Sequence, residues 1–163
     1  MSQISHIIVK VNQQKLYCCD DQEKVLLEFP VSTSSLGIGN QNGSFKTPLG
    51  EHSIAQKIGA DCAINEVFVG RVPQGVLEVL QAENKPLPED IITSRILWLQ
   101  GMEPGVNIGE GIDSYQRYIY IHGTAEEEKI GTPASHGCVR MRNQDVIDLF
   151  NRVDEGCRVT IQE

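Results

Sequence analysis

Short runs of β-branched and aliphatic residues, separated by polar turns, dominate the N-terminal part of the chain. Ile7–Val11, Lys15–Cys19 and Val25–Phe29 are runs of this kind, and the turns between them are rich in Asn, Gln and Asp. This spacing predicts a meander at the start of a sandwich or barrel. Pro30 cannot donate to a strand ladder, so we expect it to end the third strand or to lie at an edge. The fold class predicted is mainly β with short helices.

The size and charge of the chain limit its organisation and its partners. With 163 residues it is long enough for a single good core, and we predict one domain over residues 1–163. The formal net charge of −8 argues against nucleic acid or an anionic membrane surface as the main partner. Residues 1–10 lack the features of a signal peptide or membrane anchor, and an odd number of cysteines suits a reducing compartment. We therefore expect a cytoplasmic protein.

The segment Ser135–Met141, together with His122–Thr124 upstream, places a thiol, two imidazoles and flexible backbone amides close together in the sequence. Cys138 becomes a strong nucleophile as a thiolate, and a nearby imidazole is the natural acceptor for its proton. Glycine at position 137 leaves room for a carbonyl substrate and lets successive N–H groups point at an oxyanion. The pattern indicates a cysteine acyl-transfer enzyme.

Two other interpretations of these residues remain open. A lone cysteine or histidine is most often structural, either buried as a small apolar group or hydrogen-bonded to a neighbour. A metal site could be built from His122, His136 and Cys138, but the ligand spacings of zinc motifs are missing and structural zinc normally has four ligands. We expect neither a metal nor another cofactor.

The motifs resemble those of a known enzyme family. His-Gly-Thr, a short spacer and Ser-His-Gly-Cys-Val-Arg-Met, with the spacing from His122 to Cys138, resemble the signature of the L,D-transpeptidase catalytic domain, the YkuD-like family. Further blocks in family order are Phe29–Thr33, Lys46–Gly50, Arg95–Leu99 and Arg117–His122. The resemblance covers nearly the whole chain. It implies a YkuD-like β-sandwich or barrel and chemistry on peptidoglycan stem peptides.

The resemblance also implies a role for each site residue. Cys138 is expected to attack the carbonyl of the third stem residue and to expel the fourth, a D-amino acid. His122 is the expected base, held by the main-chain carbonyl of Gly123. His136 and Gly137, with the Cys138 amide, are expected to form the oxyanion site.

Four more residues are candidates for binding the substrate: Ser135, Arg140, Thr124 and Tyr120. Arg140 could bind a substrate carboxylate or pair with a surface acid, and Ser135 could bind substrate or stabilise its own turn. Because side chains alternate along a strand, Tyr118, Tyr120 and His122 are predicted to share one face. A packed aromatic ladder, with His122 as a filler, is the alternative for that face.

The remaining segments give a coarse prediction. The glycine-rich loop 37–43 has the spacing G-x-G-x-x-x-G and is predicted to be a surface turn rather than a phosphate-binding loop. Val72–Leu80 is predicted to be a short helix, and a substrate-flanking segment is expected somewhere between residues 61 and 88. Asn143 is predicted to cap a helix. The apolar face of that helix is predicted from helical spacing to contain Val146, Leu149, Phe150 and Val153.

The fate of the acyl-enzyme decides the reaction. An amine gives a cross-link or exchanges the terminal D-amino acid, whereas water gives carboxypeptidase activity. Most relatives that cross-link peptidoglycan are exported, so the expected cytoplasmic location favours water. We hypothesise an L,D-carboxypeptidase that removes terminal D-Ala from free tetrapeptides or muropeptides during peptidoglycan recycling. The alternatives are an L,D-transpeptidase and a non-catalytic module that binds stem peptides.

Overall fold

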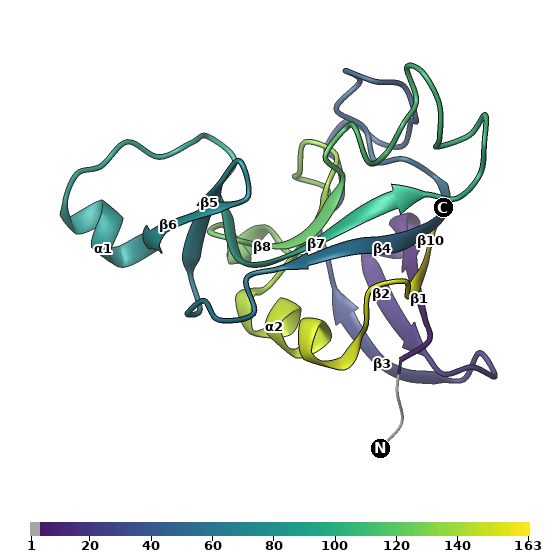
Figure 1. The fold of residues 1–163 in the computed structure, drawn as a ribbon, viewed down its shortest axis with the longest axis horizontal. Coiled ribbons are helices and arrows are strands. Elements are labelled where there is room, and N and C mark those ends of the chain that lie inside the picture. Colours follow the sequence, from purple (N-terminus) through teal and green to yellow (C-terminus); the bar gives the residue numbers. More distant parts are fainter. Residues whose placement is uncertain (1–3) are drawn as a thin grey trace.

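Among residues 4–163, which the computed structural model describes, ten strands form one mixed sheet and two short α-helices lie beside it (Figure 1). The first residues of the predicted domain, Met1 to Gln3, lie outside the described residues. The strands are β1 His6–Lys10, β2 Lys15–Cys19, β3 Val25–Pro30, β4 Gly50–Ile58, β5 Glu66–Val69, β6 Val72–Val76, β7 Ile92–Gly101, β8 Tyr120–Thr124, β9 Val139–Met141 and β10 Arg158–Gln162. The helices are α1 Leu77–Ala82 and α2 Asn143–Arg152, with 3-10 turns at Val11–Gln13 and Glu127–Lys129. The predicted mainly β fold is confirmed.

The order of the strands explains how the sheet encloses a core. The path runs β3-β2-β1-β10-β4-β7-β5-β6, with β8 paired to β7 and β9 paired to β8. The meander β1–β3 forms as predicted, and β3 ends at Pro30. Beyond it, Ser32 forms an antiparallel bridge with Arg140 of β9, which closes the sheet on itself. Figure 1 shows β5, β6 and α1 projecting from one end of this arrangement.

The alternation of side chains along the strands creates two apolar clusters. The main core lies inside the sheet and contains Leu97 and Leu99 of β7, Ile121 of β8 and the buried face of α2. Each fully buried aliphatic side chain of this kind contributes roughly 1.5–3 kcal/mol. The smaller cluster contains Ile96 and Trp98 of β7 and Tyr120 of β8, from the alternate positions of these strands, together with Phe68 of β5. It is the face with the smaller cluster that carries the candidate site.

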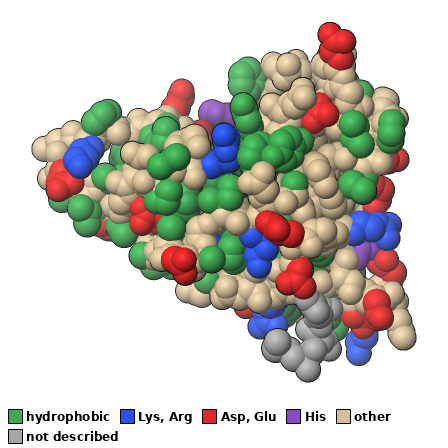
Figure 2. All heavy atoms as spheres, viewed as in Figure 1, with side chains coloured by type: hydrophobic (Ala, Val, Ile, Leu, Met, Phe, Trp, Pro, Cys, Tyr) green, Lys and Arg blue, Asp and Glu red, His purple; other side chains and the backbone are tan. Residues whose placement is uncertain are grey.

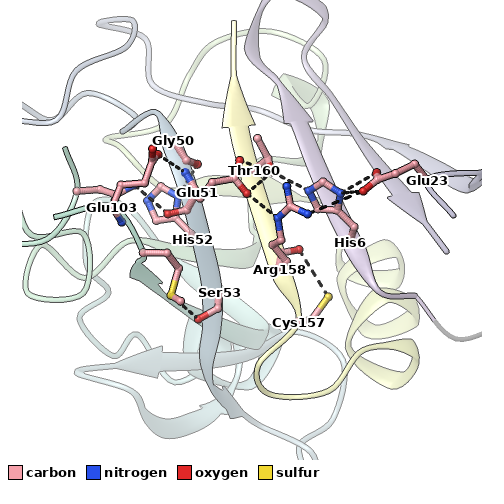
Figure 3. A network of polar contacts seen from close by, with 12 residues as sticks. His6, Glu23, Gly50, Glu51, His52, Ser53, Glu103, Cys157, Arg158 and Thr160 are labelled. Atoms are coloured by element: carbon pink, nitrogen blue, oxygen red, sulfur yellow. Dashed lines mark hydrogen bonds and ion pairs between the residues drawn. The ribbon is translucent and has the colours of Figure 1, made fainter. Parts of the chain in front are cut away.

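A polar network joins three neighbouring strands elsewhere in the sheet (Figure 3). Arg158 of β10 donates from Nε to Glu51 Oε1 of β4 at 2.7 Å, and the Thr160 hydroxyl lies 2.8 Å from Glu51 Oε2. On the other side, His6 Nε2 of β1 lies 2.7 Å from Thr160 Oγ1, and His6 Nδ1 lies 2.8 Å from Glu23. These contacts fix β10 between β1 and β4, where the C-terminal strand completes the sheet.

The predicted helix over Val72–Leu80 is wrong in its first part. That part is β6, which pairs with β5 through a tight turn, and the helix begins only at Leu77. Pro73 and Gly75 explain the difference, since proline removes a helical donor and glycine with φ +125° does not suit a helix.

The helix α2 has the predicted buried face, formed by Val146, Leu149 and Phe150, and Val153, the residue after the helix, is buried as well. The predicted cap is wrong, because Arg142 occupies the cap position and Asn143 is the first helical residue. The Asn143 side chain instead donates to Thr124 O at 2.9 Å, while the Glu127 carboxylate accepts the Asn143 N–H at 2.7 Å. Glu127 therefore accepts a hydrogen bond from a main-chain N–H at the start of this helix, which has no partner within the helix. Neither described helix is long and apolar enough to cross a bilayer.

Candidate active site

Parallel pairing of β8 and β9 brings the motif residues together. His122 in β8 lies opposite Arg140 in β9, and one step back along both strands Ile121 lies opposite Val139. Cys138 immediately precedes β9 and packs against the cluster that contains Tyr120. Opposed residues of neighbouring strands point to the same face, so His122, Arg140, Cys138 and Tyr120 all point away from the main core.

The Cys138 thiol is positioned by the main chain that leads into β8. Its sulfur accepts the Tyr120 N–H at 3.3 Å and lies 3.3 Å from the Tyr118 carbonyl oxygen, which can accept the thiol proton. Tyr118 has φ +58° and lies just before the strand, so the predicted strand begins two residues later than expected, at Tyr120. Burial raises the pKa of Cys138 to about 12, against a smaller lowering by the Tyr120 hydrogen bond. The thiol is therefore protonated at neutral pH and needs a base during attack.

His122 has the geometry that such a base requires. The ring is fully buried, and Nδ1 lies 2.5 Å from the Gly123 carbonyl oxygen. A carbonyl can only accept, so Nδ1 carries the hydrogen and Nε2 of the neutral ring holds a lone pair. Nε2 has no hydrogen-bond partner among the described residues, and burial lowers the pKa of the ring. The imidazole is therefore neutral and ready to accept a proton.

Gly123 allows the strand that carries His122 to pack closely on its neighbours. A Cβ at this position would lie 2.5 Å from Asn143 Oδ1 and 2.5 Å from the carbonyl oxygen of Thr93. Backbone on one side and a buried amide on the other leave no space for a side chain. The glycine thus permits the contact between β7, β8 and α2 that holds the imidazole in place.

The loop before Cys138 is fixed by hydrogen bonds on both sides. Gly137 has φ +129°, and a Cβ there would come within 3.3 Å of the Lys46 carbonyl oxygen. Thr47 donates from its hydroxyl to Gly137 O at 3.0 Å, and the Gly137 N–H points to Ser135 Oγ at 3.2 Å. Only glycine adopts this conformation without strain. In the described conformation the Gly137 amide is hydrogen-bonded within its own turn rather than directed into open space.

His136, the other residue predicted for the oxyanion site, is exposed beside the thiol. It lines the same cleft as Cys138, and its Nδ1 lies 3.7 Å from Asp90 Oδ2. Asp90 lies in the loop before β7, so the imidazole and a carboxylate meet at the rim of the site.

Two residues predicted to bind substrate are buried and use their hydroxyl groups internally. Ser135 donates to Cys138 O at 2.6 Å, as expected if this residue stabilises its own turn. Thr124 accepts the Glu126 N–H at 3.1 Å at the end of β8. The Ser135 hydroxyl thus stabilises the turn that carries the nucleophile, and the Thr124 hydroxyl stabilises the turn after β8.

Arg140 is buried and paired with two acids. Its Nη2 lies 2.6 Å from Asp90 Oδ1, and its Nη1 lies 3.2 Å from Glu126 Oε1. The side chain of Arg140 is only 3% exposed, whereas those of Asp90 and Glu126 are 23% and 39% exposed. The guanidinium therefore joins β9 to two surface loops, and a role in binding substrate stays a prediction.

A cleft of about 230 Å³ opens beside the thiol. It is lined by Asn42, Gly43, Phe45, Gln116, Arg117, Tyr118, Ile119, His136 and Cys138. The glycine-rich loop 37–43 thus forms one wall, a role that its composition alone does not indicate. Arg117, on another wall, is joined to this loop and to the segment after it, since its Nη1 donates to Gly39 O at 3.3 Å and its Nη2 to Lys46 O at 2.6 Å.

An aromatic cluster beside the cleft is larger than the tyrosine face predicted from the sequence. Trp98 stacks on Tyr115 with ring centroids 4.1 Å apart and an interplanar angle of 2°. Tyr120 meets the indole edge-on at 5.7 Å, and Tyr118 lies at 5.9 Å. The alternating Tyr118, Tyr120 and His122 pattern was the available signal. Trp98 joins these residues only through the pairing of β7 with β8, and Tyr115 comes from the loop before β8.

Charged side chains are dispersed on the face shown in Figure 2, where Lys and Arg occur among acidic and hydrophobic groups without forming a continuous basic patch. Within residues 4–163, no three His, Cys, Asp or Glu side chains converge as metal ligands would.

A family model described as the YkuD L,D-transpeptidase catalytic domain matches residues 4–161. The chain belongs to this family. The resemblance expected from the motifs is therefore confirmed, and with it, at the level of the family, a cysteine acyl-transfer enzyme. The roles of the individual site residues remain predictions.

Curated YkuD-family relatives match over short segments. The chain is 54% identical over 41 residues to the putative L,D-transpeptidase YkuD of Bacillus subtilis, which is 25% of this chain and 25% of that protein. It is 51% identical over 43 residues to the probable L,D-transpeptidase YbiS of Escherichia coli, which is 26% of this chain and 14% of that protein. The matched segments span about a quarter or less of these relatives.

Solved YkuD-family structures share the fold. An L,D-transpeptidase from Mycobacterium smegmatis superposes with a TM-score of 0.57 at 16% identity, over 99% of this chain and 59% of that chain. An L,D-transpeptidase from Xylanimonas cellulosilytica gives 0.55 at 16% identity, over 99% and 61% of the two chains. At these identities the likeness establishes the fold alone.

Proposed function

We propose that the chain is a cysteine-dependent L,D-carboxypeptidase that removes the terminal D-Ala from murein tetrapeptides. The observation that carries the acyl-transfer chemistry is the buried His122 ring, whose Nδ1 faces the Gly123 carbonyl and whose Nε2 is left without a partner. The Cys138 sulfur lies on the same face, at the edge of a cleft.

The proposed reaction proceeds in two steps. In the first, His122 Nε2 takes the thiol proton while Cys138 Sγ attacks the carbonyl carbon of the third stem residue. The Gly137 N–H, after turning away from Ser135 Oγ, stabilises the oxyanion together with the Cys138 N–H. The C–N bond then breaks, and the amine of D-Ala leaves with the proton from His122. In the second step His122 deprotonates water, which attacks the thioester, and the thiol and the tripeptide are released.

The proposed preference for hydrolysis over transpeptidation goes with a proposed cytoplasmic location. Free muropeptides are available as substrates there, whereas the polymeric cell wall is not. A role in peptidoglycan recycling requires the same location, which cell fractionation with an epitope-tagged chain tests.

Intact-protein mass spectrometry during turnover of a tetrapeptide tests the proposal. We expect a transient adduct of the tripeptide acyl group, lost in Cys138→Ala and retained in Cys62→Ala, which removes the other half-buried cysteine. A persistent complex without adduct or D-Ala release would indicate a stem-peptide binding module instead. An adduct that forms and resolves only when an amine is added would indicate a transpeptidase.

A further inference from the structure

Arg71 occupies an unusual backbone conformation at the tip of the β5–β6 hairpin. Val69 pairs with Val72, so Gly70 and Arg71 form a two-residue turn, with φ of +56° and +67°. Turns with two positive φ angles strongly favour Gly, Asn and Asp, because in this conformation a Cβ comes too close to the following carbonyl oxygen. An arginine at this position is strained, and strained residues gather at functional sites.

The turn places the guanidinium of Arg71 over the aromatic cluster. Its Cζ lies 4.6 Å from the centre of the Trp98 ring and 5.1 Å from that of Tyr118. Its Nη1 donates to the Tyr120 hydroxyl at 3.0 Å. These contacts are within the range of favourable cation–π interactions and fix the planar group before any ligand arrives.

The guanidinium of Arg71 has no acidic partner in the part of the chain that the structure describes, where its hydrogen bond goes to a phenol. Two other arginines near the site are engaged. Arg140 pairs with two carboxylates, and Arg117 donates to the main-chain carbonyl of Gly39 in the glycine-rich loop. The guanidinium of Arg71 is thus fixed in position and keeps N–H donors that are not hydrogen-bonded to the described residues. Two parallel N–H groups of a guanidinium can bind both oxygens of a carboxylate.

Two tyrosines connect Arg71 with the nucleophile. The Tyr118 ring beneath it belongs to a residue that lines the cleft and whose carbonyl oxygen lies 3.3 Å from Cys138 Sγ. Tyr120, its hydrogen-bond partner, donates its N–H to the same sulfur. A ligand whose carbonyl carbon reaches Sγ can therefore extend a neighbouring group over the Tyr118 ring to the guanidinium.

We propose that Arg71 is the residue that binds a carboxylate of the stem peptide and so orients the scissile bond over Cys138. This inference rests on the proposed function for the identity of the ligand. The tetrapeptide is anionic and the chain carries a net charge of −8, so the protein as a whole repels the peptide. A fixed cation at the site offsets this repulsion locally. The carboxylate comes either from the terminal D-Ala or from the second carboxyl group of a diamino acid at the third position.

Binding to the inactive Cys138→Ala enzyme tests this role without requiring turnover. Calorimetry would measure the Kd of three peptides, namely the tetrapeptide containing meso-diaminopimelate, its C-terminal amide, and the form amidated on diaminopimelate. We expect the further change Arg71→Gln to raise the Kd of the free acid about 10- to 100-fold, since hydrogen bonds to charged groups contribute about 1.5–3 kcal/mol. Arg71→Lys should restore part of the affinity.

The three peptides identify the carboxylate. The effect of Arg71→Gln should disappear for one amidated peptide and persist for the other, and either pattern supports the proposal. An equal effect on all three peptides, or no effect, would overturn it, because Arg71 would then only support the aromatic cluster. Lys85→Gln, which removes a charge from the same projecting region, should change each Kd less than about twofold. Failure of the wild type to release D-Ala would reject the proposed function while leaving this binding result intact.

Discussion

Replacing Arg140 by methionine should destabilise the fold without removing a contact to the substrate. The change keeps the apolar volume of the side chain but leaves Asp90 and Glu126 without the cation that they share. Truncating one partner of a buried ion pair costs about 3–5 kcal/mol. The carboxylates of Asp90 and Glu126 are partly exposed and can rehydrate, so we expect about 2–3 kcal/mol, below that range.

Urea unfolding followed by Trp98 fluorescence measures this difference. Arg152→Met is a matched control, because that arginine pairs with Asp148 on the surface and both side chains are exposed, at 45% and 39%. We expect the control to lose less than about 0.5 kcal/mol. In a double-mutant cycle, Asp90→Asn should cause little further loss once Arg140 is replaced.

The kinetics of the Arg140→Met enzyme separate the two interpretations of this residue. Below its unfolding transition, the variant should keep a near-normal KM for tetrapeptide, because Arg140 is occupied by protein carboxylates. A stability change under about 0.5 kcal/mol, together with a KM raised tenfold or more, would refute the structural interpretation and make Arg140 a substrate ligand.

Three further outcomes follow from the site. Gly123→Ala should lower the free energy of unfolding by about 1–3 kcal/mol in urea titrations, because its Cβ would lie 2.5 Å from Thr93 O; an unchanged midpoint would contradict the packing. The acid limb of kcat/KM should fall below pH 6.5, the ordinary pKa of histidine, since burial lowers the pKa of His122 and the neutral ring is the active form; a limb above it would reject this base. Alkylation of Cys138 by iodoacetamide should rise about tenfold per pH unit between pH 6 and 9, because its pKa is about 12, whereas a plateau would reveal a preformed thiolate.

Local sequence patterns were sufficient for the main strands and for the choice of Cys138 and His122 as candidate nucleophile and base. Cys138 and His122 lie in short motifs whose residue types indicate a nucleophile and a base. The buried apolar face of α2 follows from helical spacing alone. Contacts between distant segments were not predictable in this way. The carboxylates that pair with Arg140 come from separate loops, and Asn143 looks like a helix cap until Thr124 is seen beside it.

The substrate-flanking segment shows the same limit. It was expected between residues 61 and 88, but its composition does not indicate which residue reaches the site. Arg71 is identified only once β5 pairs with β7 and the hairpin tip lies over Trp98. A proline and a glycine in β6 could have argued against the predicted helix, and a hairpin there would have drawn attention to Gly70 and Arg71.

The most direct measurement is the product distribution from meso-diaminopimelate tetrapeptide, determined by mass spectrometry with and without excess D-methionine. The proposed carboxypeptidase should release D-Ala and give tripeptide as the main product even when D-methionine is present, and Cys138→Ala should give none. Exchange of D-Ala for D-methionine or a cross-linked dimer, with little tripeptide, would contradict hydrolysis and identify the chain as a transpeptidase.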